Sequence, residues 1–329
     1  MKNSKMASLI LAVLCFVFVF DMVVFPMGIP RNIPFLGWYA AGDKYIFNLV
    51  TQEEKQENEY RISLIGSSMV QKGLQAETIE KVLSEKTSRT IRVLNYAIGG
   101  AYTCDYLLSF QRAQLATPDL IVMGISWRDF LNDDEVDPKN TGVYKLLYDG
   151  NENVPGFMKT DSFEENIDLR LKEVWGLYKY RQWIRMNFGS LISAIVEPSR
   201  EKNIRYFIES PDIDWNRIEA LVRASYEKSD RVYPNKQSVC MEEMLSLKQQ
   251  TKILVVNLPT HSIWFKEDHY GMQIAYKEMI ENILGLNATQ YVDATSLCKD
   301  GYFIDSTHLG MVGSLFFSEW LAENIYQIM

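Results

Sequence analysis

Short apolar runs alternate along the chain with stretches in which apolar residues have helical spacing. Runs with the length of a buried strand occur at 62–65, 91–94, 120–123, 253–256 and 291–292. Apolar residues recur with the period of an amphipathic helix over 74–83, 105–115, 270–284 and 312–325. Because strands and helices alternate in this order, the pattern predicts an α/β domain whose parallel sheet is covered by helices on both faces.

A long apolar segment lies near the amino terminus, at 6–27, and contains one charged residue, Asp21. As a helix it would be roughly 33 Å long, enough to cross a hydrocarbon layer of about 30 Å. Lys2 and Lys5 precede it, and the positive-inside rule then places the amino terminus in the cytoplasm. We expect residues 1–27 to form a cytoplasmic tip and a single-pass anchor in the cell membrane, with the remaining chain extracytoplasmic. A cleaved signal peptide is the alternative.

The rest of the chain divides into a connector and one large domain. Residues 28–60 include a polar run without an apolar period, as expected of a juxtamembrane connector. The α/β pattern covers 61–329 but is interrupted at about 132–250, an interval that is too long for a loop. We expect this interval to be a largely helical insertion.

Charge and composition exclude several functions. The chain has 34 Lys and Arg residues against 42 Asp and Glu, so it lacks the basic surface that nucleic-acid binding requires. Its 4 cysteines include no CxxC pair and it has 3 histidines, which argues against a structural zinc site, and we expect no metal or other cofactor. Cys104, Cys240 and Cys298 can form at most one disulfide, and the sequence does not say between which two.

The first candidate for catalysis is Ser68, in the sequence Gly-Ser-Ser-Met at 66–69 directly after the first predicted strand. Its hydroxyl would lie at the carboxyl end of a parallel strand, where α/β sheets bind their ligands. A serine there is a nucleophile if a base removes its proton, and backbone N–H groups of the turn can stabilise the oxyanion that forms. The alternative is that the serines of this turn cap the following helix.

Two further blocks carry candidate chemistry. The stretch 95–103 follows the second strand and includes Gly99 and Gly100, a pair that permits a tight turn whose N–H groups approach a ligand. Asp305 precedes His308 by three residues, so its carboxylate can accept the Nδ1–H of the imidazole and free Nε2 to act as a base. The alternatives are an ordinary turn and a histidine that caps a helix or packs in the core.

Together these blocks resemble the motifs of the SGNH, or GDSL-like, hydrolases. In that family the nucleophile turn reads Gly-Asp-Ser, so Ser68 matches the nucleophile and Ser67 replaces the usual aspartate. The same Gly-Ser-Ser form occurs in the membrane-anchored proteins of teichoic acid D-alanylation. Asn95 and Gly100 match the asparagine and the oxyanion glycine of the second block.

Asp305 and His308 match the last block of the family, Asp-x-x-His-Leu. The resemblance implies a flavodoxin-like three-layer α/β/α fold, the SGNH hydrolase fold. It also implies that Ser68 attacks an acyl carbonyl, that His308 takes the proton and that Asp305 orients the imidazole. The backbone N–H groups of Ser68 and Gly100 would stabilise the oxyanion.

The third block departs from the family pattern. Where the family has Gly-x-Asn-Asp, this chain has Ser126-Trp127-Arg128-Asp129 when the aspartates are aligned, so that Arg128 replaces the oxyanion asparagine. Three interpretations stay open: Arg128 donates to the oxyanion, recognises an anionic group of the substrate, or pairs with an acid such as Asp129.

The resemblance implies a membrane-anchored serine acyl esterase or O-acyltransferase that modifies a cell-envelope polysaccharide or teichoic acid. It would act beside a multi-spanning membrane acyltransferase, as in teichoic acid D-alanylation and exopolysaccharide O-acetylation. The alternative is a non-catalytic component of such a complex that binds glycan or acts as a scaffold. Ser67, Asn95, Thr103 and His261 are further polar residues at which we expect substrate contact.

Overall fold

The computed structural model describes most of the chain from Glu54 onward. The described residues are 54–130, 137–160, 162–174, 235–247, 251–265, 270–287 and 289–329, with isolated positions at 8, 12, 13, 15, 16, 178, 215, 216 and 218–220. Most of the predicted anchor at 6–27 and much of the predicted insertion lie outside these residues. Within the described part, no helix combines the length and the apolar character needed to cross a bilayer.

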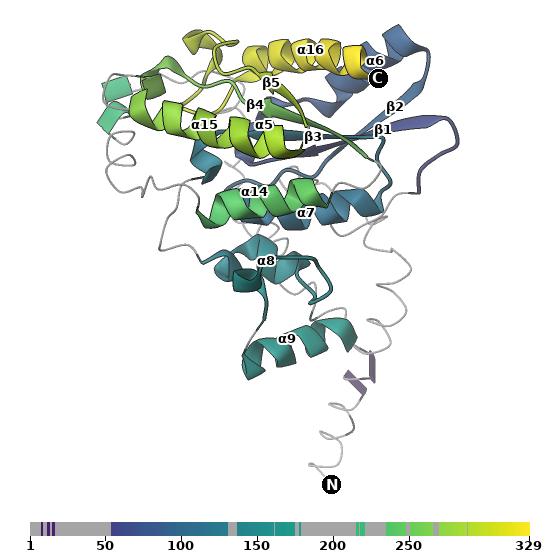
Figure 1. Ribbon diagram of the computed structural model, residues 1–329. Helices are drawn as coiled ribbons and strands as arrows, with labels where there is room; N and C mark the ends of the chain where they lie inside the picture. Colours follow the sequence, from purple (N-terminus) through teal and green to yellow (C-terminus); the bar gives the residue numbers. More distant parts are fainter. Residues whose placement is uncertain are drawn as a thin grey trace. The chain divides into compact units, whose positions relative to one another are not determined.

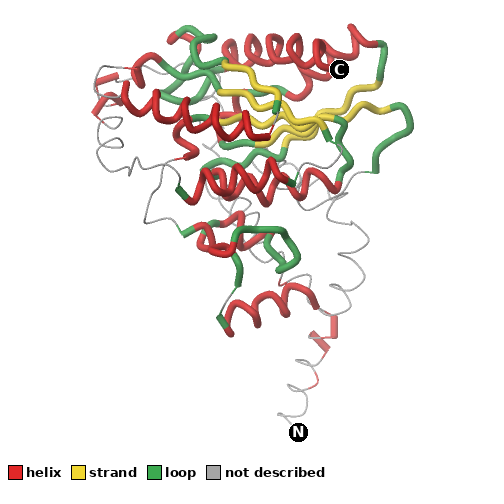
Figure 2. Tube along the Cα trace, in the orientation of Figure 1, coloured by secondary structure: helices red, strands yellow, loops and turns green. Residues whose placement is uncertain are grey.

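The centre of the domain is a five-stranded parallel sheet with the order β2-β1-β3-β4-β5 (Figure 1, Figure 2). The strands are β1 (Glu59–Ile65), β2 (Thr90–Asn95), β3 (Leu120–Ile125), β4 (Lys252–Asn257) and β5 (Gln290–Asp293). This is the order of the flavodoxin-like doubly wound folds. The predicted parallel sheet is therefore confirmed, and each predicted strand lies within an observed one.

Helices cover both faces of the sheet (Figure 1). The helices of these two layers are α5 (Ser68–Gly73), α6 (Ala76–Thr87), α7 (Thr103–Leu115), α14 (Lys236–Ser246), α15 (Tyr270–Asn287) and α16 (Met311–Ile328). On one face α16 packs against α6 and α5, whereas α14 packs between α7 and α15 on the other. The sequence pattern predicts the three longest of these helices, α7, α15 and α16, to within a few residues of their ends, as well as most of α6, and it misses α5.

Shorter helices connect these elements. They are η2 (Trp127–Phe130), η3 (Pro138–Asn140), α8 (Gly142–Leu147), η4 (Gly156–Met158), η6 (Ser262–Phe265) and η8 (Asp300–Tyr302). Of these, η2 begins just after the carboxyl end of β3, and η6 begins a few residues after the carboxyl end of β4. They therefore belong to the edge of the sheet at which the candidate residues lie.

At the centre of the sheet, β3 is entirely apolar, and its neighbour β1 is mostly apolar from Ile62 onward. All of β3 is buried, and so are the last five residues of β1. Burial on both faces requires apolar side chains at consecutive positions rather than at alternate ones. The runs at 62–65 and 120–123 have this character, and the register pairs Ile62 with Leu120 and Ile65 with Met123.

The chain divides into two compact units, and the sheet with its helices belongs to the larger. The smaller unit includes 148–151 and α9 (Phe163–Val174). Within it, the Lys172 ammonium pairs with Asp168 at 2.8 Å and donates to the Tyr148 carbonyl at 3.4 Å. The bounds predicted for the insertion, about 132–250, stay a prediction. Within that interval, α14 packs against α7 and α15, which cover the sheet.

Candidate active site

The nucleophile turn joins β1 to α5 and places Ser68 at the first position of the helix. Gly66 is required by the approach of β3, because a Cβ on it would lie 2.8 Å from the carbonyl oxygen of Gly124. Ser67 is the N-cap of α5, and its hydroxyl accepts a hydrogen bond from the Met69 N–H at 3.4 Å. The close strand contact and the cap together leave Ser68 half-buried at the carboxyl edge of the sheet.

Three side chains form a continuous chain of hydrogen bonds at this edge. The Ser68 Oγ lies 2.8 Å from His308 Nε2, and His308 Nδ1 lies 2.7 Å from Asp305 Oδ2. Ser68 and His308 are 240 residues apart in the sequence, so the fold brings them together. This is the geometry of a Ser-His-Asp triad, in which a carboxylate fixes the tautomer of the imidazole and leaves Nε2 facing the hydroxyl.

Asp305 is held by the backbone of its own turn. Its Oδ1 accepts hydrogen bonds from the N–H groups of Thr307 and His308, each at 2.7 Å. Burial acts to raise the pKa of Asp305, but the hydrogen bond and charge of His308 and the two backbone N–H groups outweigh it and hold the pKa below its usual value. The carboxylate is therefore ionised across the neutral range and can stabilise an imidazolium.

The turn that carries Asp305 and His308 is fixed from two sides. The Ile304 N–H donates to the His308 carbonyl at 2.9 Å, closing the turn on itself. The indole N–H of Trp264, from η6 after β4, donates to the Ser306 carbonyl at 2.6 Å. Trp264 is a positioning residue that sequence reasoning misses, and its only signal is its place beyond the carboxyl end of a strand.

The glycine pair of the second block lies beside the nucleophile. A Cβ on Gly99 would lie 3.8 Å from the Ser68 Cβ, and Gly100 has a φ of +76°, which an L side chain rarely adopts. The Ile98 N–H donates to the Gly66 carbonyl at 2.9 Å, which ties this turn to the nucleophile turn. Neither the Ser68 N–H nor the Gly100 N–H donates to another described residue, so both can face a developing oxyanion.

The serine and the aspartate of the third block are buried and bond to each other. Asp129 is 4% exposed, and its Oδ2 accepts from the N–H of Ser126 at 2.7 Å and from the Ser126 hydroxyl at 3.1 Å. Burial raises the pKa of Asp129 to about 6, against the opposing effect of these hydrogen bonds. The aspartate of this block thus closes the turn after β3.

Arg128 lies over the ring of Trp264, with the guanidinium carbon 5.5 Å from the ring centroid. No described carboxylate forms an ion pair with it within 4.0 Å, and no contact joins it to Ser68 among the described residues. The interpretation of Arg128 as an oxyanion donor therefore stays a prediction. Trp264 nevertheless connects Arg128 to the turn that holds Asp305 and His308, because its indole N–H donates to the Ser306 carbonyl of that turn.

The four residues at which substrate contact is expected are all buried and bonded within the fold, and their role toward substrate stays a prediction. Thr103 is fully buried and donates to the Asp129 carbonyl at 2.8 Å, and Ser67 caps α5. Asn95 is 5% exposed, and its Oδ1 accepts from the Ala97 N–H.

His261 is 6% exposed and is the fourth of these residues. Its Nδ1 accepts from the Ile263 N–H at 3.0 Å, and its ring stacks on that of Trp215 with centroids 4.3 Å apart. Burial lowers the pKa of His261, although the carboxylates of Asp300 and Asp305 act in the opposite direction. A neutral, packed imidazole accounts for these contacts without a substrate.

Comparisons with known proteins give similarity at the level of solved structures. No protein-family model matches the chain, and no curated protein matches its sequence. An acetylxylan esterase, Axe2, from Geobacillus stearothermophilus is 12% identical, with 81% of this chain and 94% of that one covered and a TM-score of 0.42. A lipase/acylhydrolase from Enterococcus faecalis is also 12% identical, with 81% and 95% covered and a TM-score of 0.38.

The class of site is defined by the fold and by the three side chains themselves. A doubly wound parallel sheet that carries a hydrogen-bonded serine, histidine and aspartate at its carboxyl edge has the arrangement of an α/β serine hydrolase. Among the described residues, no group of three or more His, Cys, Asp or Glu side chains is arranged to hold a metal ion.

Proposed function

We propose that the protein is a serine acyl esterase or acyltransferase in which Ser68 is the nucleophile. The observation that carries this proposal is the unbroken contact from Ser68 Oγ to His308 Nε2 and from His308 Nδ1 to Asp305. His308 takes the hydroxyl proton as Ser68 attacks the acyl carbonyl, and it then protonates the leaving alkoxide. Water or a sugar hydroxyl next attacks the acyl-enzyme while His308 takes its proton, and His308 returns that proton to Ser68 Oγ as the bond from the acyl group to Ser68 breaks.

The N–H groups of Ser68 and Gly100 supply the oxyanion site in this proposal. They belong to turns that the bond from Ile98 N–H to Gly66 O holds together, so the two donors have fixed positions before substrate binds. Each donor of this kind contributes roughly 3 kcal/mol to transition-state stabilisation. Because Arg128 packs on Trp264, the site is proposed to work without the asparagine donor of the family pattern.

We further propose that the protein is anchored in the cell membrane with its catalytic domain outside, and that it acylates or deacylates a cell-envelope polysaccharide or teichoic acid. Two observations support this. The apolar segment 6–27 is long enough to span a bilayer, and Cys104 forms a disulfide with Cys240, which is typical of proteins in an oxidising compartment. A multi-spanning membrane acyltransferase is the partner that the motif resemblance implies.

A non-catalytic role in binding glycan is the second candidate, and the third block is the observation that favours it. Asp129 and Arg128 are both engaged in packing, so this block contributes no donor to the oxyanion site among the described contacts. A binding protein would have no need to retain the contact between Ser68 and His308. The intact triad therefore favours catalysis over this alternative.

The test is reaction of the full-length protein with a fluorophosphonate probe, with the modified residue identified by mass spectrometry. We expect stoichiometric modification at Ser68 and none in Ser68→Ala. Ser67→Ala is the matched control, since it removes the neighbouring hydroxyl and should leave the labelling intact. Labelling that persists in Ser68→Ala, or its absence from the folded wild type, would overturn the nucleophile assignment.

Hydrolysis and transfer are separated with the same protein. The acetyl-enzyme formed from p-nitrophenyl acetate is offered a short envelope glycan, and acetate and acetylated glycan are quantified together. A transferase yields acetylated glycan in proportion to acceptor concentration, whereas an esterase yields acetate alone. Absence of both products from a protein that labels at Ser68 would contradict the proposed substrate class.

A further inference from the structure

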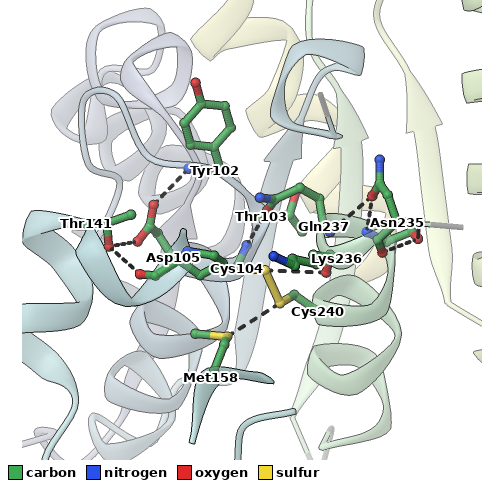
Figure 3. The surroundings of a disulfide bond; sticks show 12 residues. Tyr102, Thr103, Cys104, Asp105, Thr141, Met158, Asn235, Lys236, Gln237 and Cys240 are labelled. Carbon is green, nitrogen blue, oxygen red and sulfur yellow. Dashed lines mark hydrogen bonds between the residues drawn. A yellow bond between two sulfur atoms is a disulfide. The ribbon is translucent and has the colours of Figure 1, made fainter. Parts of the chain in front are cut away.

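The disulfide between Cys104 and Cys240 lies directly beside the turn that carries the oxyanion glycine (Figure 3). Cys104 is the second residue of α7, the helix that begins at the end of that turn, and Cys240 lies in α14. The two Cα atoms are 5.0 Å apart, and both cysteines are buried, at 1% and 0% exposure. The bond closes a loop of 136 residues, so it joins two parts of the chain that are otherwise distant.

The oxyanion turn is well held at its amino-terminal side. Asn95 ends β2, and its Oδ1 accepts from the Ala97 N–H at 2.9 Å. The Ile98 N–H then donates to the Gly66 carbonyl at 2.9 Å. From Gly99 onward the described backbone makes a single further bond within the turn, from the Ala101 N–H to the Ile98 carbonyl at 3.2 Å. The position of Gly100 therefore depends on where α7 begins.

The start of α7 is fixed by one of its own side chains and by side chains from other elements (Figure 3). Asp105 caps it by accepting from the Tyr102 N–H at 3.1 Å, and the Thr141 hydroxyl donates to the same carboxylate at 2.6 Å. The Cys104 N–H donates to the Gln237 side chain, on the first turn of α14, at 2.9 Å. The disulfide adds a covalent bond between the same two helices.

The first turn of α14 also holds the third block. Asn235, its N-cap, donates through its side-chain amide to the Phe130 carbonyl at 2.8 Å. Thr103 completes the connection, since its hydroxyl donates to the Asp129 carbonyl at 2.8 Å. The amino-terminal part of α14 thus contacts the segments that follow β2 and β3. Among the described residues, the disulfide is the only covalent cross-link between α14 and these segments.

We propose that the Cys104–Cys240 disulfide is a positioning element of the active site: by fixing the start of α7 it holds Gly100 where its N–H meets the oxyanion. This inference rests on the proposed acyl-transfer function. Three residues separate Gly100 from Cys104, so a displacement of the first turn of α7 passes directly into the glycine turn. A misplacement of about 1 Å at a reacting centre can reduce a rate by roughly a hundredfold.

Substitution is a cleaner way to remove the bond than reduction. Reduction would transfer two electrons and two protons from a dithiol reagent to the two sulfurs and leave two thiols, but both sulfurs are shielded from solvent. The test therefore compares wild type with the double variant Cys104→Ser and Cys240→Ser. Cys298→Ser is the matched control, because Cys298 is also buried and forms no disulfide.

The measurement is kcat and KM for p-nitrophenyl acetate at a temperature at which far-ultraviolet circular dichroism shows every variant folded. We expect kcat of the double variant to fall at least about tenfold with KM changed less than about twofold, because the oxyanion donors act on the transition state. The pH at which the rate falls to half should not move, since the bonds of His308 to Ser68 and Asp305 are untouched. Cys298→Ser should keep the wild-type kcat.

A disulfide that only stabilises the fold would give the opposite result. The melting temperature of the double variant would fall while kcat of the folded protein stayed within about twofold of wild type, and that outcome would overturn the proposal. If the serine pair does not fold, Cys104→Ala with Cys240→Val refills the buried volume and is judged by the same criteria. Failure of the proposed function is distinguishable, because Ser68→Ala would then retain the wild-type rate.

Discussion

The turns after β1 and β3 leave neighbouring strands at the same edge of the sheet, yet they use their polar residues in opposite ways. After β1, Ser68 is half-buried and its hydroxyl meets the imidazole of His308 at 2.8 Å. After β3, Asp129 is buried and its carboxylate closes its own turn on Ser126. A position at the carboxyl edge of a parallel sheet is therefore not enough to make a residue part of the site.

The difference arises from what each turn must satisfy locally. In the β1 turn, Ser67 caps the helix, which leaves the Ser68 side chain available. In the β3 turn, Ser126 is 1% exposed, and its N–H and hydroxyl both need an acceptor that water cannot supply. Asp129 is that acceptor, and so it is not available for substrate.

The largest effect is expected from Asp305→Asn, which breaks the triad on the side away from the nucleophile. The amide oxygen can still accept from the Thr307 and His308 N–H groups, but the amide nitrogen cannot accept the Nδ1–H of His308. We expect kcat to fall roughly 10⁴-fold with little change in the free energy of unfolding. Steady-state kinetics and urea denaturation of the same preparation measure the two quantities. A loss of less than tenfold would mean that Asp305 does not orient the base.

The next effect concerns stability in the β3 turn. Asp129→Ala leaves the Ser126 N–H without its acceptor, and we expect the free energy of unfolding to fall by roughly 1–3 kcal/mol. Asp129→Asn is the matched control, since its amide oxygen can keep the bond and the loss should be smaller. Urea denaturation of both variants is the measurement, and equal losses would contradict the role assigned to the acceptor.

A comparison of Asp129→Asn with the wild type tests the titration of Asp129. Burial raises its pKa in the folded protein to about 6 from the usual 3.8, so the native state binds more protons than the unfolded chain between these values. The stability that protonated Asp129 gives is therefore present below about pH 4 and lost as the pH rises through about 6. Asp129→Asn cannot ionise, and its stability should decline less than that of the wild type between pH 4 and 7. Identical declines would exclude the raised pKa.

A smaller effect is expected where a hydroxyl beside the nucleophile is removed. Ser67→Ala deletes the N-cap of α5, which costs about 1 kcal/mol of stability in a typical helix. The rate at which Ser68 reacts with p-nitrophenyl acetate should stay close to that of the wild type when the protein is folded. A loss of activity comparable with that of Ser68→Ala would give Ser67 a place in the chemistry that its hydrogen bond does not indicate.

The smallest effect is expected from Arg128→Ala on a neutral ester. Because the guanidinium lies over Trp264 and no described contact joins it to Ser68, kcat should change less than about threefold, or ~0.7 kcal/mol. The outcome that would restore Arg128 as an oxyanion donor is a loss of about a hundredfold in kcat. Arg128→Lys distinguishes charge from the flat stacking of the guanidinium.

The sequence predicts the sheet and the long helices because their periods are carried by many residues at once. It misses α5, whose six residues are too few to show a helical period, and it places α14 in the insertion although Pro234 and Asn235 mark a break directly before it. Strands buried on both faces, such as β3, are recognised by their continuous apolar character.

The candidate site could be predicted only in part. Ser68, Asp305 and His308 lie in short motifs whose spacing indicates their chemistry, and the structure brings these three together. Thr103 and Asn95 look equally polar in the sequence, but their partners lie in the backbone of the fold and cannot be read from spacing. The disulfide partner of Cys104 cannot be read from spacing either, because it depends on how α7 and α14 pack together.

The most direct measurement is a crystal structure of the protein after reaction with a fluorophosphonate. We predict a covalent bond between phosphorus and Ser68 Oγ, with the phosphoryl oxygen at hydrogen-bonding distance from the N–H groups of Ser68 and Gly100 and with His308 Nε2 beside Oγ. A phosphoryl group bonded to another residue, or one whose oxygen points away from both N–H groups, would contradict the proposed active site.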